Sequence, residues 1–127
     1  MASEVRKILV IDDSPTTRFL IASVIEQIEG VQIVEAESGF EALKILPSSH
    51  FDLVLTDINM PDINGLEVLN FLKNHPNYKN IPVIIISTEK AKKDRRKGLR
   101  LGAEEYITKP FDAKALFQIV ERILVKA

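Results

Sequence analysis

Short apolar runs alternate along the chain with longer stretches in which apolar residues recur at helical spacing. The first, third and fourth runs are almost continuously apolar, which is typical of strands that are covered on both faces of a sheet. The pattern predicts five strands, at Lys7–Ile11, Val31–Glu35, Leu53–Thr56, Val83–Ser87 and Glu105–Thr108.

A helix is predicted directly after the first strand. Ser14 is suited to the N-cap position, and Pro15 is suited to the first helical turn. The segment "TTRFLIASVIEQIEG" follows and ends at Gly30. It carries one apolar stripe at helical spacing, formed by Leu20, Val24, Ile25 and Ile28.

Four more helices are predicted between and after the remaining strands. "SGFEALKIL" has Ser38 and Glu41 at capping-box spacing, and "NGLEVLNFLKN" repeats the pattern with Asn64 and Glu67. "TEKAKKDRRKGLRLG" has helical propensity but few apolar anchors, mainly Ala91 and Leu99. The last helix follows a cap at Asp112 and has an apolar stripe of Leu116, Phe117, Val120, Ile123 and Leu124.

Strand and helix therefore alternate five times, which predicts an α/β fold. Such a pattern is typical of a doubly wound parallel sheet with helices on both faces and right-handed crossovers. The length of 127 residues suits one domain. In these folds the binding site lies beyond the carboxyl ends of the strands, near the point where the strand order reverses.

Composition narrows the function classes. Hydrophobic residues make up 46% and charged residues 28%, as in globular proteins, and there is no cysteine to form a disulfide or a thiolate metal site. The net charge of −1 gives no overall attraction to nucleic acid or membranes. Because the N-terminal segment lacks a signal-like apolar stretch and no run is long enough to cross a membrane, we expect a cytoplasmic protein.

Polar residues stand at the predicted strand ends. Asp12 and Asp13 follow the first strand, Asp57 follows the third, Ser87 closes the fourth and Lys109 follows the fifth. Each residue also has an ordinary structural explanation. Asp12 or Asp13 could cap a helix, and Asp57 could be a loop carboxylate. Ser87 could bond to nearby backbone, and Lys109 could be a solvated surface lysine. Parallel strands bring their carboxyl ends to one edge of the sheet, so the combination favours a site.

Three carboxylates at one edge repel each other. Two unit charges 4 Å apart interact by about 4 kcal/mol at an effective dielectric constant of 20, and one lysine cannot neutralise three acids. Either a carboxylate takes up a proton or a divalent cation binds. Oxygen ligands without histidine or cysteine favour Mg²⁺ or Mn²⁺, and a carboxylate beside such an ion can act as a nucleophile.

These residues resemble the receiver domain of two-component response regulators, in particular its stand-alone CheY-like members. The resemblance rests on "ILVIDDSP", "FDLVLTDINMPDINGLE", "PVIIIST" and "YITKPF", which stand in the family's order and spacing over almost the whole chain. It implies a flavodoxin-like fold with strand order 2-1-3-4-5. It also implies signal transduction by a phosphorelay, with phosphoryl transfer from a sensor histidine kinase or a histidine phosphotransfer protein.

The resemblance assigns a role to each strand-end residue. Asp57 would be the phosphoacceptor, and Lys109, before a cis Pro110, would pair with the phosphoryl group. Asp13, Asp57 and the backbone carbonyl of Asn59 would ligate the metal ion, with Asp12 acting through a metal-bound water. Ser87 would donate a hydrogen bond to a phosphoryl oxygen, both as part of the catalytic set and as the start of a conformational switch in which Tyr106 turns inward behind it.

We expect residues 1–127 to be a single receiver domain without an effector domain, which catalyses its own phosphorylation and dephosphorylation but is no enzyme in the usual sense. The signal would leave through the surface of the fourth helix, fifth strand and fifth helix. The basic residues predicted to bind a downstream protein there are Lys90, Lys92, Lys93, Arg95, Arg96, Lys97 and Arg100. A solvated basic face is the ordinary alternative. A nucleic-acid site is less favoured because no aromatic residues interleave the charges.

Two other function classes stay open from the residues alone. A metal-dependent phosphohydrolase would need a further acid–base group, and His50 and His75 fall away from the strand ends. A nucleotide-binding module is disfavoured because the chain has neither G-x-G-x-x-G nor a P-loop. The cognate kinase, the output partner and the choice between motility and another phosphorelay are not encoded in any motif.

Overall fold

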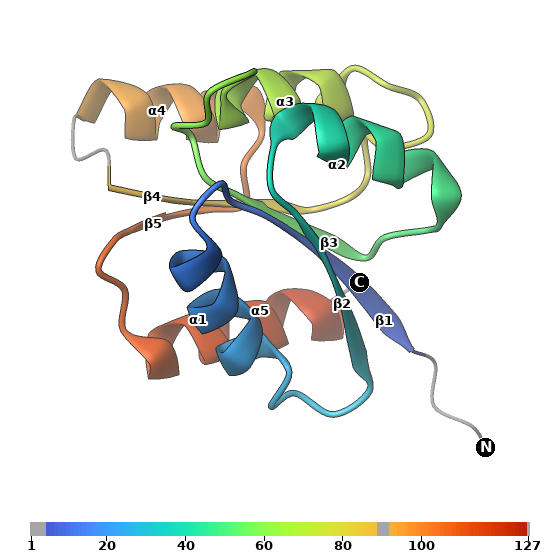
Figure 1. The fold of residues 1–127 in the computed structure, drawn as a ribbon, viewed down its shortest axis with the longest axis vertical. Helices are drawn as coiled ribbons and strands as arrows, with labels where there is room; N and C mark the ends of the chain where they lie inside the picture. Colours follow the sequence, from blue (N-terminus) through green and yellow to red (C-terminus); the bar gives the residue numbers. More distant parts are fainter. Residues whose placement is uncertain (1–4, 89–91, 127) are drawn as a thin grey trace.

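A computed structural model describes residues 5–88 and 92–126. Its centre is a parallel five-stranded sheet with the order β2-β1-β3-β4-β5, which confirms the predicted topology (Figure 1). The strand bounds agree with the predicted ones to within one residue at each end. The strands are β1 (Arg6–Ile11), β2 (Val31–Ala36), β3 (Leu53–Thr56), β4 (Val83–Ser87) and β5 (Glu105–Thr108).

Helices cover both faces of the sheet, as expected for a doubly wound fold. α1 (Pro15–Ile25) and α5 (Ala113–Lys126) lie on one face. The other face carries α2 (Gly39–Ile45), which runs into a short 3₁₀ turn at Leu46–Ser48, together with α3 (Gly65–Lys73) and α4 (Lys92–Leu101) (Figure 1).

β1 shows why the apolar runs are continuous. Its side chains alternate between the two faces of the sheet. Leu9 and Ile11 belong to the core under α2 and α3, whereas Ile8 and Val10 belong to the core under α1 and α5. All four are almost fully buried. A strand between two helical layers therefore needs apolar residues at consecutive positions.

Two predicted helix caps are confirmed. The Ser14 hydroxyl accepts a hydrogen bond from the Thr17 backbone N–H at 3.3 Å, and Pro15 begins α1. At α3, Asn64 and Glu67 form a reciprocal capping box, in which each side chain accepts from the other's backbone N–H. Both devices act over three residues, so the local sequence is enough to specify them.

The start of α2 is held differently from the prediction. Ser38 caps the Glu41 N–H at 3.1 Å, but the Glu41 carboxylate accepts from Glu37 rather than from Ser38. A second carboxylate, Asp62 from the β3–α3 loop, accepts from the Phe40 N–H at 2.8 Å. This hydrogen bond is the main reason why the pKa of Asp62 is lowered, against an opposing effect of desolvation. The β3–α3 loop is thus tied to α2.

The predicted apolar stripe of α1 is confirmed for Val24, Ile25 and Ile28, which pack against the core, and is wrong for Leu20. Ile21 and Ile25 are buried against the sheet, whereas Leu20 is 50% exposed. The helix ends at Ile25, so Ile28 packs from the following turn. Apolar residues from position 19 to 22 give the helix two adjacent apolar faces, and packing against the sheet selects the one that contains Ile21.

The expected anchoring of α4 by Leu99 is also wrong, because this side chain is 40% exposed. The helix instead places Gly98 against β4 and β5 and keeps Leu101 partly buried. Ala91 and Lys90 lie outside the described residues, and of Lys92 and Lys93 only the backbone is described. Among the described helices, none is both long and apolar enough to span a bilayer.

Gly65 brings the start of α3 against the end of β3. A Cβ atom at this position would overlap the backbone carbonyl oxygen of Asp57, and the Gly65 N–H donates to the Ile58 carbonyl at 2.9 Å. Backbone cannot move aside as the tip of a side chain can. The close approach therefore requires glycine.

We expect Gly65→Ala to lower the free energy of unfolding by about 2–3 kcal/mol, because the new methyl group forces backbone apart. Gly98→Ala is the matched control. Its Cβ would meet the flexible tip of Ile85, and the gain in helix propensity of about 1 kcal/mol offsets this contact. Urea denaturation measures both. An equal loss in the two variants would contradict the proposed role of the Asp57 backbone.

Candidate functional site

Three carboxylates meet at the carboxyl edge of the sheet. Asp12 and Asp13 follow β1, and Asp57 follows β3, which is the neighbour of β1 in the sheet. One oxygen of each lies within 4.8 Å of the others. Asp12 and Asp57 are buried, and Asp13 is exposed. The structure thus brings together the acids that the sequence predicted.

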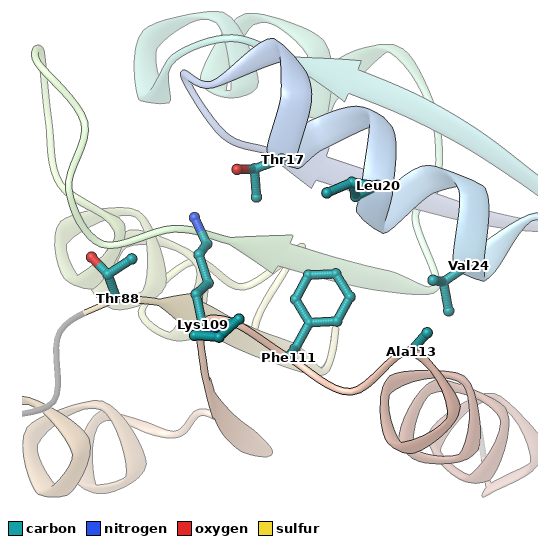
Figure 2. A pocket seen from close by; sticks show the side chains of 8 residues that line it. Thr17, Leu20, Val24, Thr88, Lys109, Phe111 and Ala113 are labelled. Atoms are coloured by element: carbon teal, nitrogen blue, oxygen red, sulfur yellow. The ribbon is translucent and has the colours of Figure 1, made fainter.

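Lys109 reaches this cluster from the loop after β5. Its Nζ lies 2.9 Å from Asp12 Oδ2 and 3.3 Å from Asp57 Oδ2. β4 separates β5 from β3 in the sheet, so the long lysine side chain is needed to span the distance. Figure 2 shows the extended side chain with its ammonium group pointing away from the loop. The following Lys109–Pro110 peptide bond is cis, as the resemblance implied.

The two oxygens of Asp57 face different partners. Oδ1 accepts from the backbone N–H groups of Ile58 at 2.7 Å and Asn59 at 3.4 Å, whereas Oδ2 faces Lys109. The Asp57 N–H donates to the Ile11 carbonyl at 3.0 Å and continues the β1–β3 ladder. Backbone contacts therefore fix the orientation of the carboxylate and direct one oxygen toward the ammonium group.

The β1–α1 loop has a support that the sequence analysis missed. Asp12 Oδ1 accepts from the Ser14 N–H at 2.9 Å. Arg18 donates to the Asp12 carbonyl at 2.7 Å and pairs with Glu35 on β2 at 2.8 Å. The arginine is one turn into α1, so its position on a helix was predictable. Its contacts with both the β1–α1 loop and β2 could not be predicted from the sequence.

The charges and donor types fit a divalent cation. One ammonium group faces three carboxylates, so the cluster keeps an excess of negative charge. The side-chain ligands are all oxygens, and no histidine or cysteine joins the group among the residues that the structure describes. This donor set fits Mg²⁺ or Mn²⁺. Asn59 is exposed next to the cluster, and its carbonyl ligation stays a prediction.

Ser87 and Tyr106 lie on neighbouring strands beside the cluster. β4 and β5 pair Ser87 with Thr108 and Ile85 with Tyr106. Ser87 is fully buried and its carbonyl accepts from the Lys109 N–H at 2.9 Å. Tyr106 is buried as well. Arg95 of α4 donates to its carbonyl at 3.0 Å and lies 5.9 Å from its ring centroid. β5 thus links the cluster to α4.

The histidines lie away from the site, as predicted. His50 precedes β3 at the amino edge of the sheet, and its side chain is 82% exposed. His75 follows α3 and stacks on Tyr78 with a centroid distance of 4.4 Å. Neither can serve as an acid–base group for the carboxylates at the opposite edge.

Similar proteins have this fold and length. Protein PilH of Pseudomonas aeruginosa is 35% identical over 118 residues, which cover 93% of this chain and 97% of PilH. The structure of the chemotaxis protein CheY4 of Vibrio cholerae matches with a TM-score of 0.85 and 28% identity, covering 94% of this chain and 98% of CheY4. The phosphorylated cyanobacterial phytochrome response regulator RcpA matches with a TM-score of 0.82 and 32% identity, covering 94% and 91%.

The family of response regulator receiver domains matches residues 8–121. This range includes the three aspartates, Ser87, Tyr106 and Lys109. Fold, strand order, the acidic cluster and the sequence match all agree, and the chain belongs to the receiver domains of two-component response regulators.

Proposed function

We propose that this receiver accepts a phosphoryl group on Asp57 from a phosphohistidine of a sensor histidine kinase or a histidine phosphotransfer protein. The observation that carries the proposal is the placement of Asp57 Oδ2. It lies 3.3 Å from the Lys109 ammonium group, on a carboxylate whose other oxygen is held by backbone N–H groups. The similar response regulator RcpA was solved in a phosphorylated form, which supports the same chemistry here.

The transfer needs little covalent chemistry from the protein. An Asp57 oxygen attacks the phosphorus atom and the phosphorus–nitrogen bond breaks. The donor ring, which carries a proton on its other nitrogen, leaves with the electron pair as neutral imidazole. The Lys109 ammonium group pairs with the negative charge of the phosphoryl oxygens. Catalysis of this kind is mainly positioning and electrostatic stabilisation. In this proposal the protein promotes its own phosphorylation and dephosphorylation and does not turn over a separate substrate.

Asp13, Asp57 and the Asn59 carbonyl are the proposed ligands of Mg²⁺ or Mn²⁺, with Asp12 acting through a bound water. The ion would neutralise charge where the phosphoryl group meets the carboxylates. Asp13 is preferred to Asp12 as a direct ligand because it is the exposed member of the cluster, whereas Asp12 is buried with its two oxygens 2.9 Å from Lys109 and the Ser14 N–H.

The signal is proposed to pass from Ser87 to Tyr106 and then to α4, β5 and α5. The downstream partner is a protein that binds the basic side of α4. Arg96, Lys97 and Arg100 are exposed there, and Lys90, Lys92 and Lys93 are proposed to extend this surface. Arg95 donates a hydrogen bond to the Tyr106 carbonyl, which favours a link between this basic surface and the switch residue. A solvated face is the alternative, and we expect neither nucleic-acid binding nor membrane insertion.

Three expectations stay predictions: a cytoplasmic location, a stand-alone receiver over residues 1–127, and a place in motility or another phosphorelay. CheY4, which is a chemotaxis protein, supports a role in motility. A phosphohydrolase of small substrates is less favoured, because both histidines lie at the far edge of the sheet. A nucleotide-binding module still has no phosphate-binding motif in its favour.

Asp57→Asn should abolish phosphoryl uptake and leave the fold intact. The amide keeps the shape of the carboxylate but is no nucleophile. The measurement is intact mass after incubation with acetyl phosphate and Mg²⁺, with circular dichroism as the control for folding. Phosphorylation of the variant at the wild-type rate would move the acceptor to another residue.

Substitutions in the cluster should change the Mg²⁺ affinity in opposite directions, depending on whether a carboxylate or the ammonium group is removed. Asp13→Ala should weaken binding about tenfold, or about 1.4 kcal/mol, and Asp12→Ala should weaken it less. Lys109→Met should tighten binding, because the ammonium group competes with the ion for the same carboxylates. Titration of each variant with Mg²⁺ tests the assignment. Unchanged affinity in Asp13→Ala would refute its role as a direct ligand.

Ser87→Ala should separate phosphorylation from the conformational response. Asp57, Lys109 and the metal ligands are untouched, so phosphoryl uptake should persist. The variant loses the proposed hydrogen bond from the Ser87 hydroxyl to the phosphoryl group. A hydrogen bond to a charged group contributes about 1.5–3 kcal/mol, which is enough to change a two-state equilibrium by about one to two decades. NMR shifts of Tyr106 and α4, with and without beryllofluoride, measure the response. Shifts equal to those of the wild type would show that Ser87 takes no part in the conformational response.

A further inference from the structure

An apolar groove lies between α1 and the segment from Lys109 to the start of α5. We call it the Lys109 groove (Figure 2). It has a volume of about 500 Å³, and its apolar walls are Leu20 and Val24 of α1 together with Pro110, Phe111 and Ala113. The half-exposed Leu20, which the sequence placed in the core, forms part of this wall.

The groove is next to the proposed phosphoacceptor site, and Lys109 belongs to both. Lys109 lines the groove, and its ammonium group is the same one that contacts Asp12 and Asp57. Thr17 and Thr88 also line it (Figure 2). A molecule that brings a phosphoryl group to Asp57 and extends past Lys109 therefore meets the apolar walls.

This combination matches a particular ligand chemistry. A cation at one end and aliphatic and aromatic side chains along the rest complement an anionic head on an apolar body. The volume falls in the range of small-molecule sites, about 300–1,000 Å³, and is far larger than the methyl group of acetyl phosphate needs. It has room for an aromatic ring.

We propose that the Lys109 groove binds the apolar leaving group of small acyl phosphates, so that this receiver prefers aromatic or long-chain acyl phosphates to acetyl phosphate. This inference rests on the proposed function of Asp57 and adds a donor specificity to it. Leu20, Val24 and Ala113 would determine that specificity, without contacting the phosphorus atom.

The reaction balances without a further reactant. An Asp57 oxygen attacks phosphorus, the bond from phosphorus to the acyl oxygen breaks, and the electron pair leaves on the departing carboxylate. No proton transfer is required at neutral pH, because both the nucleophile and the leaving group are carboxylates. Benzoate and acetate are leaving groups of similar basicity, so a large difference in rate reports contacts in the groove.

The test compares the initial rates of phosphorylation of the full chain by benzoyl phosphate and by acetyl phosphate. Both are measured by intact mass at equal Mg²⁺ and at donor concentrations far below saturation. We expect benzoyl phosphate to react at least about tenfold faster, since partial burial of a ring gives at least this factor. Equal rates in the wild type would overturn the inference.

Two variants and one control locate the effect. Ala113→Leu fills the groove from an exposed position at the start of α5, and Leu20→Asn removes an apolar wall from a half-exposed position. In both, the ratio of the two rates should fall toward that of the uncatalysed reagents. Phe40→Asn changes an equally exposed apolar residue on the opposite face of the sheet, and the ratio should persist.

The outcomes separate the two proposals. Failure of acetyl phosphate to label Asp57 in the wild type would defeat the proposed function itself. Labelling by acetyl phosphate without a benzoyl preference, or a preference that survives both groove variants, would defeat only the groove inference. Variants that keep the ratio but slow transfer from a phosphohistidine protein would identify the groove as a protein contact and overturn its role for small donors.

Discussion

The pairing of one ammonium group with two buried carboxylates is the constraint on which the site depends. Lys109 lies within 3.3 Å of both Asp12 and Asp57, and Asp13 adds a third negative charge nearby. One positive charge cannot balance three negative ones at this spacing. The cluster therefore keeps an excess of negative charge, which a further cation would offset. The same excess charge makes the site suited to a metal ion and, with it, to a phosphoryl group.

Backbone contacts give this cluster its rigidity. Gly65 lets α3 start against the Asp57 carbonyl, and N–H groups of the next two residues orient one carboxylate oxygen. Asp62 ties the same loop to the start of α2. If Asp57 is the phosphoacceptor, as proposed, a carboxylate held from several directions loses little freedom when a donor arrives, which is the physical basis of catalysis by positioning.

The opposite end of the site has weaker support. α4 keeps Leu99 exposed and contacts β5 through Gly98 and through Arg95. A helix with few buried apolar side chains costs little to shift. Lys109, Tyr106 and the β4–β5 pairing connect this helix to the carboxylates over a short path. Firm support around Asp57 and few apolar anchors at α4 would suit the proposed signal from the carboxylates to the α4 surface.

The sequence by itself determined the elements, the strand order through its motifs, and the meeting of Asp12, Asp57 and Lys109. Parallel strands must bring their carboxyl ends to one edge, and caps such as that of Asn64 act over three residues. Tertiary packing alone decided that Lys109 lies closer to Asp12 than to Asp57, that Asp62 binds the α2 N-terminus across 22 residues, and that Leu20 lines a groove. Local periodicity names an apolar helix face only to within one residue, or about 100° of rotation. Contacts between distant segments depend on how the helices settle on the sheet, and no short-range pattern encodes them.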